Sequence, residues 1–257
     1  MRAVPLVQVK DVSMKFHAPE GETTALKGLS LDIEEGDFVS IVGPSGCGKS
    51  TLLNIIAGLI KPTEGKVLIS QKPVTKVSTD VGYMPQTDQL FQWRTIWKNV
   101  ILGLEVQDKL TKENKQRVDD LLNRYGLKDF KHSYPNQLSG GMRQRAALIR
   151  TLAIDPELLL LDEAFSALDY QTRLVVSDEV KTIITKEKKT AILVTHDIAE
   201  AISMASKVIV LSHRPGTVKN VHDINLTCEE QTPLRCREAP EFRHYFNKIW
   251  KELDIHV

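Results

Sequence analysis

Cysteine is scarce in this sequence, with three residues, Cys47, Cys228 and Cys236, among 257. An odd and sparse set of cysteines is typical of reduced thiols in a cytosolic protein and argues against a disulfide-stapled secreted domain. The spacing typical of metal ligands is absent among four scattered residues: His213, His222, Cys228 and Cys236. We therefore expect these four to be ordinary surface residues.

Long apolar runs are also lacking. The longest, at residues 158–161 and 208–211, suit buried strands and fall well short of the roughly 20 residues of a membrane span. The N-terminus has no apolar stretch of signal-peptide length. We expect a chain that is soluble by itself and meets a membrane only through a partner.

There is little excess charge, because 34 Lys and Arg face 33 Asp and Glu, which leaves a net charge of +1. A nucleic-acid binder that works by bulk electrostatics usually carries a basic excess, so we expect no nucleic-acid partner. The 42% hydrophobic and 26% charged content is close to the globular average and excludes a disordered or collagen-like chain.

Strand-like and helix-like patterns alternate along the chain. Residues 4–42 are rich in alternating strand patterns, residues 95–153 are helical, and a β-α-β rhythm returns from residue 158 to 211. Such alternation predicts an α/β fold with a mostly parallel sheet, preceded by a β subdomain at the N-terminus. The helical stretch between two strand regions predicts an inserted helical subdomain at about residues 87–155.

A phosphate-loop motif follows the apolar strand predicted at residues 38–42 and precedes an amphipathic helix. Its residues are Gly43, Pro44, Ser45, Gly46, Cys47, Gly48, Lys49, Ser50 and Thr51. The glycines let consecutive N–H groups face an anion at a helix N-terminus, Lys49 can reach the β- and γ-phosphates, and Ser50 can ligate Mg²⁺. The alternative, a Gly-rich turn with an incidental lysine, is disfavoured by the strand–loop–helix context. Cys47 is expected to be a small, unreactive loop residue exposed through its backbone.

Two carboxylates, Asp162 and Glu163, follow the apolar run at residues 158–161. The carboxyl end of a parallel strand is where α/β sheets place ligands. Asp162 suits a contact to Mg²⁺ and Glu163 suits a general base that polarises the attacking water. An acidic strand end is common, so this motif gains weight only beside the phosphate loop.

A second anion-binding helix N-terminus is predicted at Ser139, Gly140 and Gly141, within the segment Leu-Ser-Gly-Gly-Met-Arg-Gln-Arg. With the Leu-rich Asp-Glu strand about 20 residues later, this segment resembles the signature of the nucleotide-binding subunit of an ABC transporter. The resemblance covers nearly the whole chain. It implies a P-loop ATPase core at residues 1–235, whose N-terminal β subdomain is antiparallel, and a homodimer with two ATP molecules sandwiched between the copies.

The resemblance also implies roles for single residues. The signature residues that act on the partner's ATP would be Leu138, Ser139, Gly140, Gly141 and Gln144, and the D-loop at the dimer seam would be Ser166, Ala167, Leu168 and Asp169. His196 matches the switch histidine, and Gln86 matches the Q-loop glutamine that senses Mg²⁺ and water. Phe16 matches the aromatic that stacks on adenine. Taken alone, His196 could be an ordinary strand-end histidine and Phe16 a simple core residue.

Three segments resemble the nitrate/sulfonate/taurine importer class: residues 88–100, 213–216 and 237–242. Gln92 stands where relatives usually have Pro. The resemblance implies a peripheral ATPase on the cytoplasmic face of the cell membrane, bound to integral permease subunits and served indirectly by an extracytoplasmic solute-binding protein. Importers of other small solutes, such as thiamine-precursor-like heterocycles, and a soluble ABC ATPase without transport function stay open as alternatives.

The C-terminal segment, residues 236–257, has apolar residues at helical spacing. They are Phe242, Tyr245, Phe246, Ile249, Trp250 and Leu253. This pattern predicts an amphipathic helix. We expect it to pack on its own domain, and a regulatory or partner-docking helix is the alternative.

Overall fold

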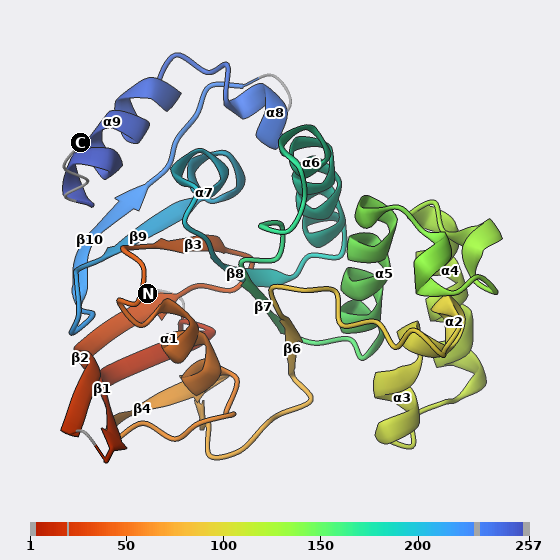
Figure 1. The fold of residues 1–257 in the computed structure, drawn as a ribbon, viewed down its shortest axis with the longest axis horizontal. Helices are drawn as coiled ribbons and strands as arrows, with labels where there is room; N and C mark the ends of the chain where they lie inside the picture. Colours follow the sequence, from red (N-terminus) through yellow and green to blue (C-terminus); the bar gives the residue numbers. More distant parts are fainter. Residues whose placement is uncertain (1–3, 20, 229–231, 254–257) are drawn as a thin grey trace.

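The computed structural model describes residues 4–19, 21–228 and 232–253. The N-terminal residues 1–3 and the end of the predicted tail helix, residues 254–257, lie outside the described residues. The described chain forms two sheets, helices that cover the second sheet, one helical region between two of its strands and a C-terminal helical segment (Figure 1).

The first sheet is antiparallel and is built from the N-terminal third of the chain. Its strands are β1 (Val7–Ala18), β2 (Gly21–Ile33), β4 (Glu64–Ile69) and β5 (Lys72–Pro73), in the order β2-β1-β4-β5. β1 pairs with β2 and with β4 in antiparallel register. The alternation that predicted these strands buries Val7 and Val9 completely, because successive side chains point to opposite faces.

The second sheet has six strands in the order β10-β9-β3-β8-β7-β6. They are β3 (Phe38–Val42), β6 (Val81–Met84), β7 (Leu158–Asp162), β8 (Thr190–Val194), β9 (Lys207–Leu211) and β10 (Val218–Asp223). All neighbours from β9 to β6 pair in parallel, and β10 adds an antiparallel edge. The predicted fold class, with a mostly parallel sheet and an antiparallel N-terminal sheet, is confirmed.

Helices cover both faces of the parallel sheet because its strands are apolar on both sides. α1 (Lys49–Ile56) follows β3, while α6 (Tyr170–Lys186) and α7 (Ile198–Met204) follow β7 and β8. Within β7, Leu159 and Leu161 join one hydrophobic core, and Leu158 and Leu160 join the other. The carboxyl ends of β3, β7 and β8 therefore lie at one edge of a rigid layer.

The chain between β6 and β7 is helical. It contains α2 (Ile96–Val100), α3 (Leu102–Val106), α4 (Lys112–Arg124), two short 3₁₀ turns, η1 (Lys128–Phe130) and η2 (Pro135–Gln137), and α5 (Gly140–Ala153). α5 packs against α2, α3 and α4 on one side and against α6 on the other. In Figure 1 these helices project from the sheet on the side away from β1 and β2.

Two residues expected at the surface are buried. His222 is 5% exposed, because β10 passes beneath the last helix, α9 (Phe242–Glu252), where its Nε2 lies 2.8 Å from Oε2 of Glu252. Cys236 is buried in α8 (Pro233–Cys236), which packs against α6 and α7. The expectation was wrong for both, since β10 and the short helix α8 have too weak a pattern to be predicted from sequence, and where the predicted C-terminal helix packs depends on the fold. His213 is exposed and Cys228 is half-buried.

α9 lies against α7, and its Ile249 and the following residue, Leu253, are buried in the main core. The rings of Phe242, Phe246 and Trp250 stack in sequence along the helix, and Phe242 and Phe246 also pack against the main core. Helix α9 is therefore part of the packed structure. Among the described helices, none is long and apolar enough to cross a membrane.

We expect truncation after Pro240 to destabilise the protein. Burial of each apolar side chain stabilises the fold by roughly 1.5–3 kcal/mol, so Ile249 and Leu253 together contribute about 3–6 kcal/mol to the free energy of unfolding. Thermal unfolding should therefore show a melting temperature lower by many degrees, whereas Lys251→Ala, at an exposed position of the same helix, should leave it unchanged. A truncated protein with its melting temperature intact would contradict this account of α9.

Candidate functional site

The phosphate loop connects the fully buried strand β3 to the start of α1. Gly46 and Gly48 have φ angles of 72° and 107°, in the left-handed region that favours glycine. A Cβ on Gly48 would lie 2.7 Å from Cδ2 of Leu26. Lys49 folds back over the loop, and its Nζ donates to the carbonyl oxygens of Gly43 at 2.8 Å and Pro44 at 3.0 Å. The sequence thus forces a tight turn around a buried ammonium group.

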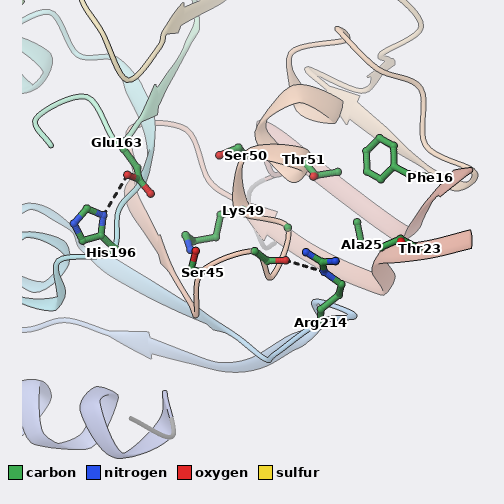
Figure 2. A pocket seen from close by; sticks show the side chains of 12 residues that line it. Phe16, Thr23, Ala25, Ser45, Lys49, Ser50, Thr51, Glu163, His196 and Arg214 are labelled. Carbon is green, nitrogen blue, oxygen red and sulfur yellow. Dashed lines mark hydrogen bonds and ion pairs between the residues drawn. The ribbon is translucent and has the colours of Figure 1, made fainter. Parts of the chain in front are cut away.

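A cavity of about 580 Å³ opens over this loop (Figure 2). Phe16 lies at one end of it, and Glu163 and His196 lie at the other. Its lining residues are Phe16, Thr23, Ala25, Ser45, Gly46, Gly48, Lys49, Ser50, Thr51, Glu163, His196 and Arg214. The side chain of Phe16 is exposed, so it is a cavity-wall residue and no part of the core. An elongated anionic ligand with an aromatic end fits this shape.

Three residues of the phosphate-loop motif do not line the cavity: Gly43, Pro44 and Cys47. The Cys47 side chain is 1% exposed and its burial raises the pKa of the thiol. The expectation of an exposed loop position is therefore wrong for this residue, although its lack of reactivity follows from the burial. The carbonyls of Gly43 and Pro44 instead hold Lys49.

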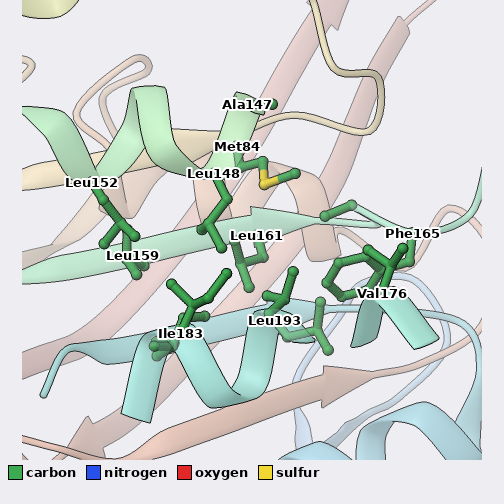
Figure 3. Packing of buried hydrophobic residues seen from close by; sticks show 14 of the residues in the cluster. Met84, Ala147, Leu148, Leu152, Leu159, Leu161, Phe165, Val176, Ile183 and Leu193 are labelled. Carbon is green, nitrogen blue, oxygen red and sulfur yellow. The ribbon is translucent and has the colours of Figure 1, made fainter. Parts of the chain in front are cut away.

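The two predicted carboxylates follow β7, which the core holds rigidly. Leu159 and Leu161 point from β7 into a cluster with Leu148 and Ile183 (Figure 3). Directly after the strand, Glu163 has a φ of 48°, an unusual conformation for a side chain with a Cβ that costs of order 1–3 kcal/mol. Its N–H donates to the carbonyl of Val194 at 2.8 Å. This turn directs Glu163 into the cavity.

Asp162 lies beside the start of α1. Its Oδ1 accepts a hydrogen bond from the Ser50 hydroxyl at 3.0 Å, and its Oδ2 accepts one from the Tyr83 hydroxyl at 3.0 Å. Burial and the adjacent Asp162 carboxylate raise the pKa of Tyr83, so its hydroxyl stays protonated and donates. The Ser50 and Asp162 oxygens, close together next to a phosphate loop, are the hard oxygen donors that Mg²⁺ prefers and fit such an ion.

Glu163 is held by two of the other predicted catalytic residues. Its Oε2 lies 3.2 Å from Nδ1 of His196 and accepts from Nε2 of Gln86 at 3.4 Å. The same Gln86 nitrogen donates to Oγ of Ser166 at 3.2 Å. Gln86 was also expected at Mg²⁺; its amide nitrogen bonds Glu163 and Ser166, and its role toward Mg²⁺ stays a prediction. The structure thus assembles a carboxylate, an imidazole and an amide at one end of the cavity.

The predicted signature and D-loop form a separate cavity of about 500 Å³. Among its lining residues are Ser139, Gly140, Gly141, Ala167, Leu168 and Asp169. Ser139 caps α5 by accepting from the N–H of Met142 at 3.3 Å, and Asp169 caps α6 by accepting from that of Thr172 at 3.0 Å. The hydrogen bonds from Thr172 lower the pKa of Asp169.

This second cavity shares no lining residue with the phosphate-loop cavity. Two more predicted signature residues, Leu138 and Gln144, have buried side chains. Neither side chain reaches the surface of this chain, so any part they take in a partner's site would be to position Ser139 and the glycines. Within one chain, the structure does not bring the signature to the phosphate loop.

Three lining residues of the phosphate-loop cavity were missed: Thr23, Ala25 and Arg214. Thr23 and Ala25 lie on β2, where nothing in an alternating strand marks a binding residue. Arg214 stands in the segment His-Arg-Pro-Gly, which had been singled out only as a class resemblance. Its Nε donates to the carbonyl of Gly46 at 3.1 Å.

Comparison with known proteins gives a family match. The model of a family described as ABC transporter matches residues 26–166. An uncharacterized ABC transporter ATP-binding protein of Bacillus subtilis, YtlC, is 48% identical over 96% of this chain and 95% of its own length. Two import proteins also match closely. The nitrate import ATP-binding protein NrtD of Synechocystis is 40% identical over 95% of this chain and 93% of its own length. The aliphatic sulfonates import ATP-binding protein SsuB of Bacillus thuringiensis is 38% identical over 93% of this chain and 96% of its own length.

A solved structure agrees with these matches. The dimeric post-hydrolysis state of the ATP-binding cassette MJ0796, bound to ADP and Pi, superposes with a TM-score of 0.71 at 35% identity. The match covers 85% of this chain and 99% of that one.

Proposed function

This chain belongs to the ABC transporter family of ATP-binding ATPases, and from that premise we propose that it is the energy-coupling subunit of a bacterial importer for a small anionic solute. The observation that carries the catalytic part of this proposal is the Glu163 carboxylate, held by His196 and Gln86 at one end of the phosphate-loop cavity. Its importing role is supported by the similarity to nitrate and sulfonate import proteins.

We infer the following roles in hydrolysis. The backbone N–H groups of the loop and Lys49 bind the β- and γ-phosphates, and Phe16 stacks on the adenine. Ser50 and Asp162 would hold Mg²⁺, which would neutralise charge on the phosphate oxygens. Glu163 orients the attacking water and accepts its proton, while His196 lies where it can contact both Glu163 and the γ-phosphate.

The active assembly is proposed to be a homodimer. The signature at Ser139 and Gly140 forms an anion-binding helix N-terminus, but it lies in a cavity separate from the phosphate loop of its own chain. A second copy arranged head to tail brings each signature onto the ATP of the other copy. The solved cassette that resembles this chain is itself dimeric, which supports the arrangement.

The permease subunits are proposed to dock on the segment between β6 and α2. Phe91 and Trp93 stack there with ring centroids 4.9 Å apart, and the Trp93 side chain is 75% exposed. A stacked, exposed aromatic pair is typical of a protein interface hot spot. Since Gln86 connects Glu163 to the start of this segment, movement at the nucleotide would be transmitted directly to the permease.

Trp93→Ala should therefore uncouple ATP hydrolysis from the membrane partner. We expect the affinity for the permease to fall roughly tenfold or more, because truncating an interface hot spot usually costs about 2 kcal/mol of binding free energy. The basal ATPase rate of the purified chain should be unchanged. Binding to the permease in detergent measures the first and phosphate release the second. Trp250→Ala on α9 is the matched aromatic control. Loss of permease binding in the Trp250 variant alone would place the docking surface on α9 instead.

The solute is tested after reconstitution with the permease subunits and the solute-binding protein in proteoliposomes. The proposal predicts ATP-dependent accumulation of nitrate, taurine or an alkanesulfonate, with no accumulation when Glu163→Gln replaces the wild-type chain. Transport of a thiamine-precursor-like heterocycle alone would keep the importer role and contradict the anionic solute.

A further inference from the structure

We propose that Arg214 is an additional nucleotide-binding residue, whose guanidinium binds the α-phosphate of the nucleotide. This inference rests on the proposed ATP site and adds a residue that lies outside the nucleotide-binding and catalytic motifs described above. Arg214 lines the phosphate-loop cavity, although it comes from the turn between β9 and β10, 168 residues away from Gly46 in the chain.

The turn at residues 212–217 is built to hold Arg214 in place. The Ser212 hydroxyl accepts from the N–H of Thr217 at 3.0 Å and also bonds the carbonyl of His213 at 2.9 Å. Gly216 joins the turn to β2: its N–H donates to the carbonyl of Ala25 at 2.8 Å. These bonds fix the backbone on both sides of Arg214, so its position does not depend on the side chain alone.

The same turn touches the phosphate loop closely. A Cβ on Gly216 would lie 2.2 Å from the carbonyl oxygen of Cys47, so only glycine fits there. A Cβ on Gly46 would lie 3.0 Å from Nη2 of Arg214, which shows that the guanidinium rests directly on the loop. The turn, β2 and the phosphate loop thus form one packed unit around the arginine.

The guanidinium is available to an anion. One of its five N–H groups, on Nε, donates to Gly46, and the groups on Nη1 and Nη2 are left to bind a ligand. Within the part of the chain that the structure describes, Arg214 forms no ion pair with a carboxylate, and its side chain is exposed. A fixed cation without a carboxylate at the wall of a phosphate-binding cavity is suited to a phosphate oxygen.

The position of Arg214 in the cavity indicates which phosphate it binds. Figure 2 shows Arg214 on the side of Thr23 and Ala25, and away from Glu163 and His196. A nucleotide with its base on Phe16 and its terminal phosphate near Glu163 has its α-phosphate between these two ends. Arg214 would therefore contribute equally to binding of ATP, ADP and AMP, in contrast to Lys49, which serves the β- and γ-phosphates.

The test is a set of affinities for Arg214→Ala, measured by displacement of a fluorescent ADP analogue. We expect ATP, ADP and AMP each to bind the variant about tenfold more weakly than the wild type, because one charge-assisted hydrogen bond is lost. The weak binding of adenosine, which has no phosphate, should be unchanged. Arg214→Lys keeps the charge but not the forked geometry, so its loss should be smaller. Arg243→Ala, at an exposed arginine of α9, is the matched control and should bind all four ligands normally.

The outcomes separate the possible explanations. If ATP and ADP weaken while AMP does not, Arg214 only braces the loop at Gly46, and the inference is overturned. If none of the nucleotides weakens, it is overturned as well, and the ATP site itself stands. A wild-type chain that binds no ATP would instead contradict the proposed function. An unchanged melting temperature of both Arg214 variants ensures that altered affinity reports on the site.

Discussion

Glu163→Gln is expected to lower ATP turnover by roughly 10²–10⁴-fold, the usual contribution of a general base, without weakening ATP binding. Glutamine has nearly the shape of glutamate, so the turn at φ 48° and the contact with Gln86 can persist. What disappears is the carboxylate that accepts the proton of the attacking water. Phosphate release measures turnover, and displacement of a fluorescent nucleotide measures binding.

The same variant should accumulate as an ATP-bound dimer. In the proposed mechanism hydrolysis reopens the ATP-bound dimer, so blocking hydrolysis traps the closed dimer. Light scattering should therefore give twice the monomer mass with ATP and one monomer mass with ADP. Glu35→Gln, at an exposed turn position, is the control and should behave as wild type. Normal turnover in Glu163→Gln would remove Glu163 from the mechanism.

Lys49→Ala is expected to abolish nucleotide binding at concentrations where the wild type is saturated. The ammonium is buried at the loop and makes charge-assisted contacts to two phosphates in the proposed complex, so its loss should weaken ATP binding about 100-fold or more. Removing it also leaves the carbonyls of Gly43 and Pro44 without their donor, which loosens the loop.

Binding and hydrolysis can be separated by comparing these two variants. Lys49→Ala should lose both, and no ATP-bound dimer should form, whereas Glu163→Gln should lose hydrolysis alone. Lys61→Ala, an exposed lysine just beyond α1, is the matched control for lost charge. Retained ATP affinity in a folded Lys49→Ala protein would show that the loop binds the phosphates without this side chain.

The strands and helices that carry the motifs could be predicted from sequence because local pattern determines them. The apolar runs at residues 38–42 and 158–161 correspond to β3 and β7, and the Ser139 cap marks the start of α5. The strand order could not be predicted, since it depends on which distant strands pair. Likewise β10 has mostly exposed residues and a weak pattern, so the position of the predicted C-terminal helix over it and the burial of His222 could not be predicted.

The same distinction between local pattern and long-range contact applies to the candidate site. Residues in contiguous motifs, such as Lys49 and Glu163, were predicted to lie together, and they line one cavity. Their roles toward ATP stay predictions. Arg214 was missed because its partner in the site, Gly46, lies far away in the chain and only the fold brings them together. Leu138 and Gln144 were grouped with the signature by motif, and the structure buries both side chains, Leu138 just before α5 and Gln144 within it.

The most direct test of the importer account is a pull-down of tagged Glu163→Gln with ATP from its native membranes in mild detergent. Co-purifying proteins are identified by mass spectrometry, with Lys49→Ala as the control that cannot form the ATP-bound dimer. The account predicts a multi-span membrane protein that is recovered with Glu163→Gln. Recovery of soluble proteins alone, with the dimer intact, would contradict it and would favour an ABC ATPase that acts without transport.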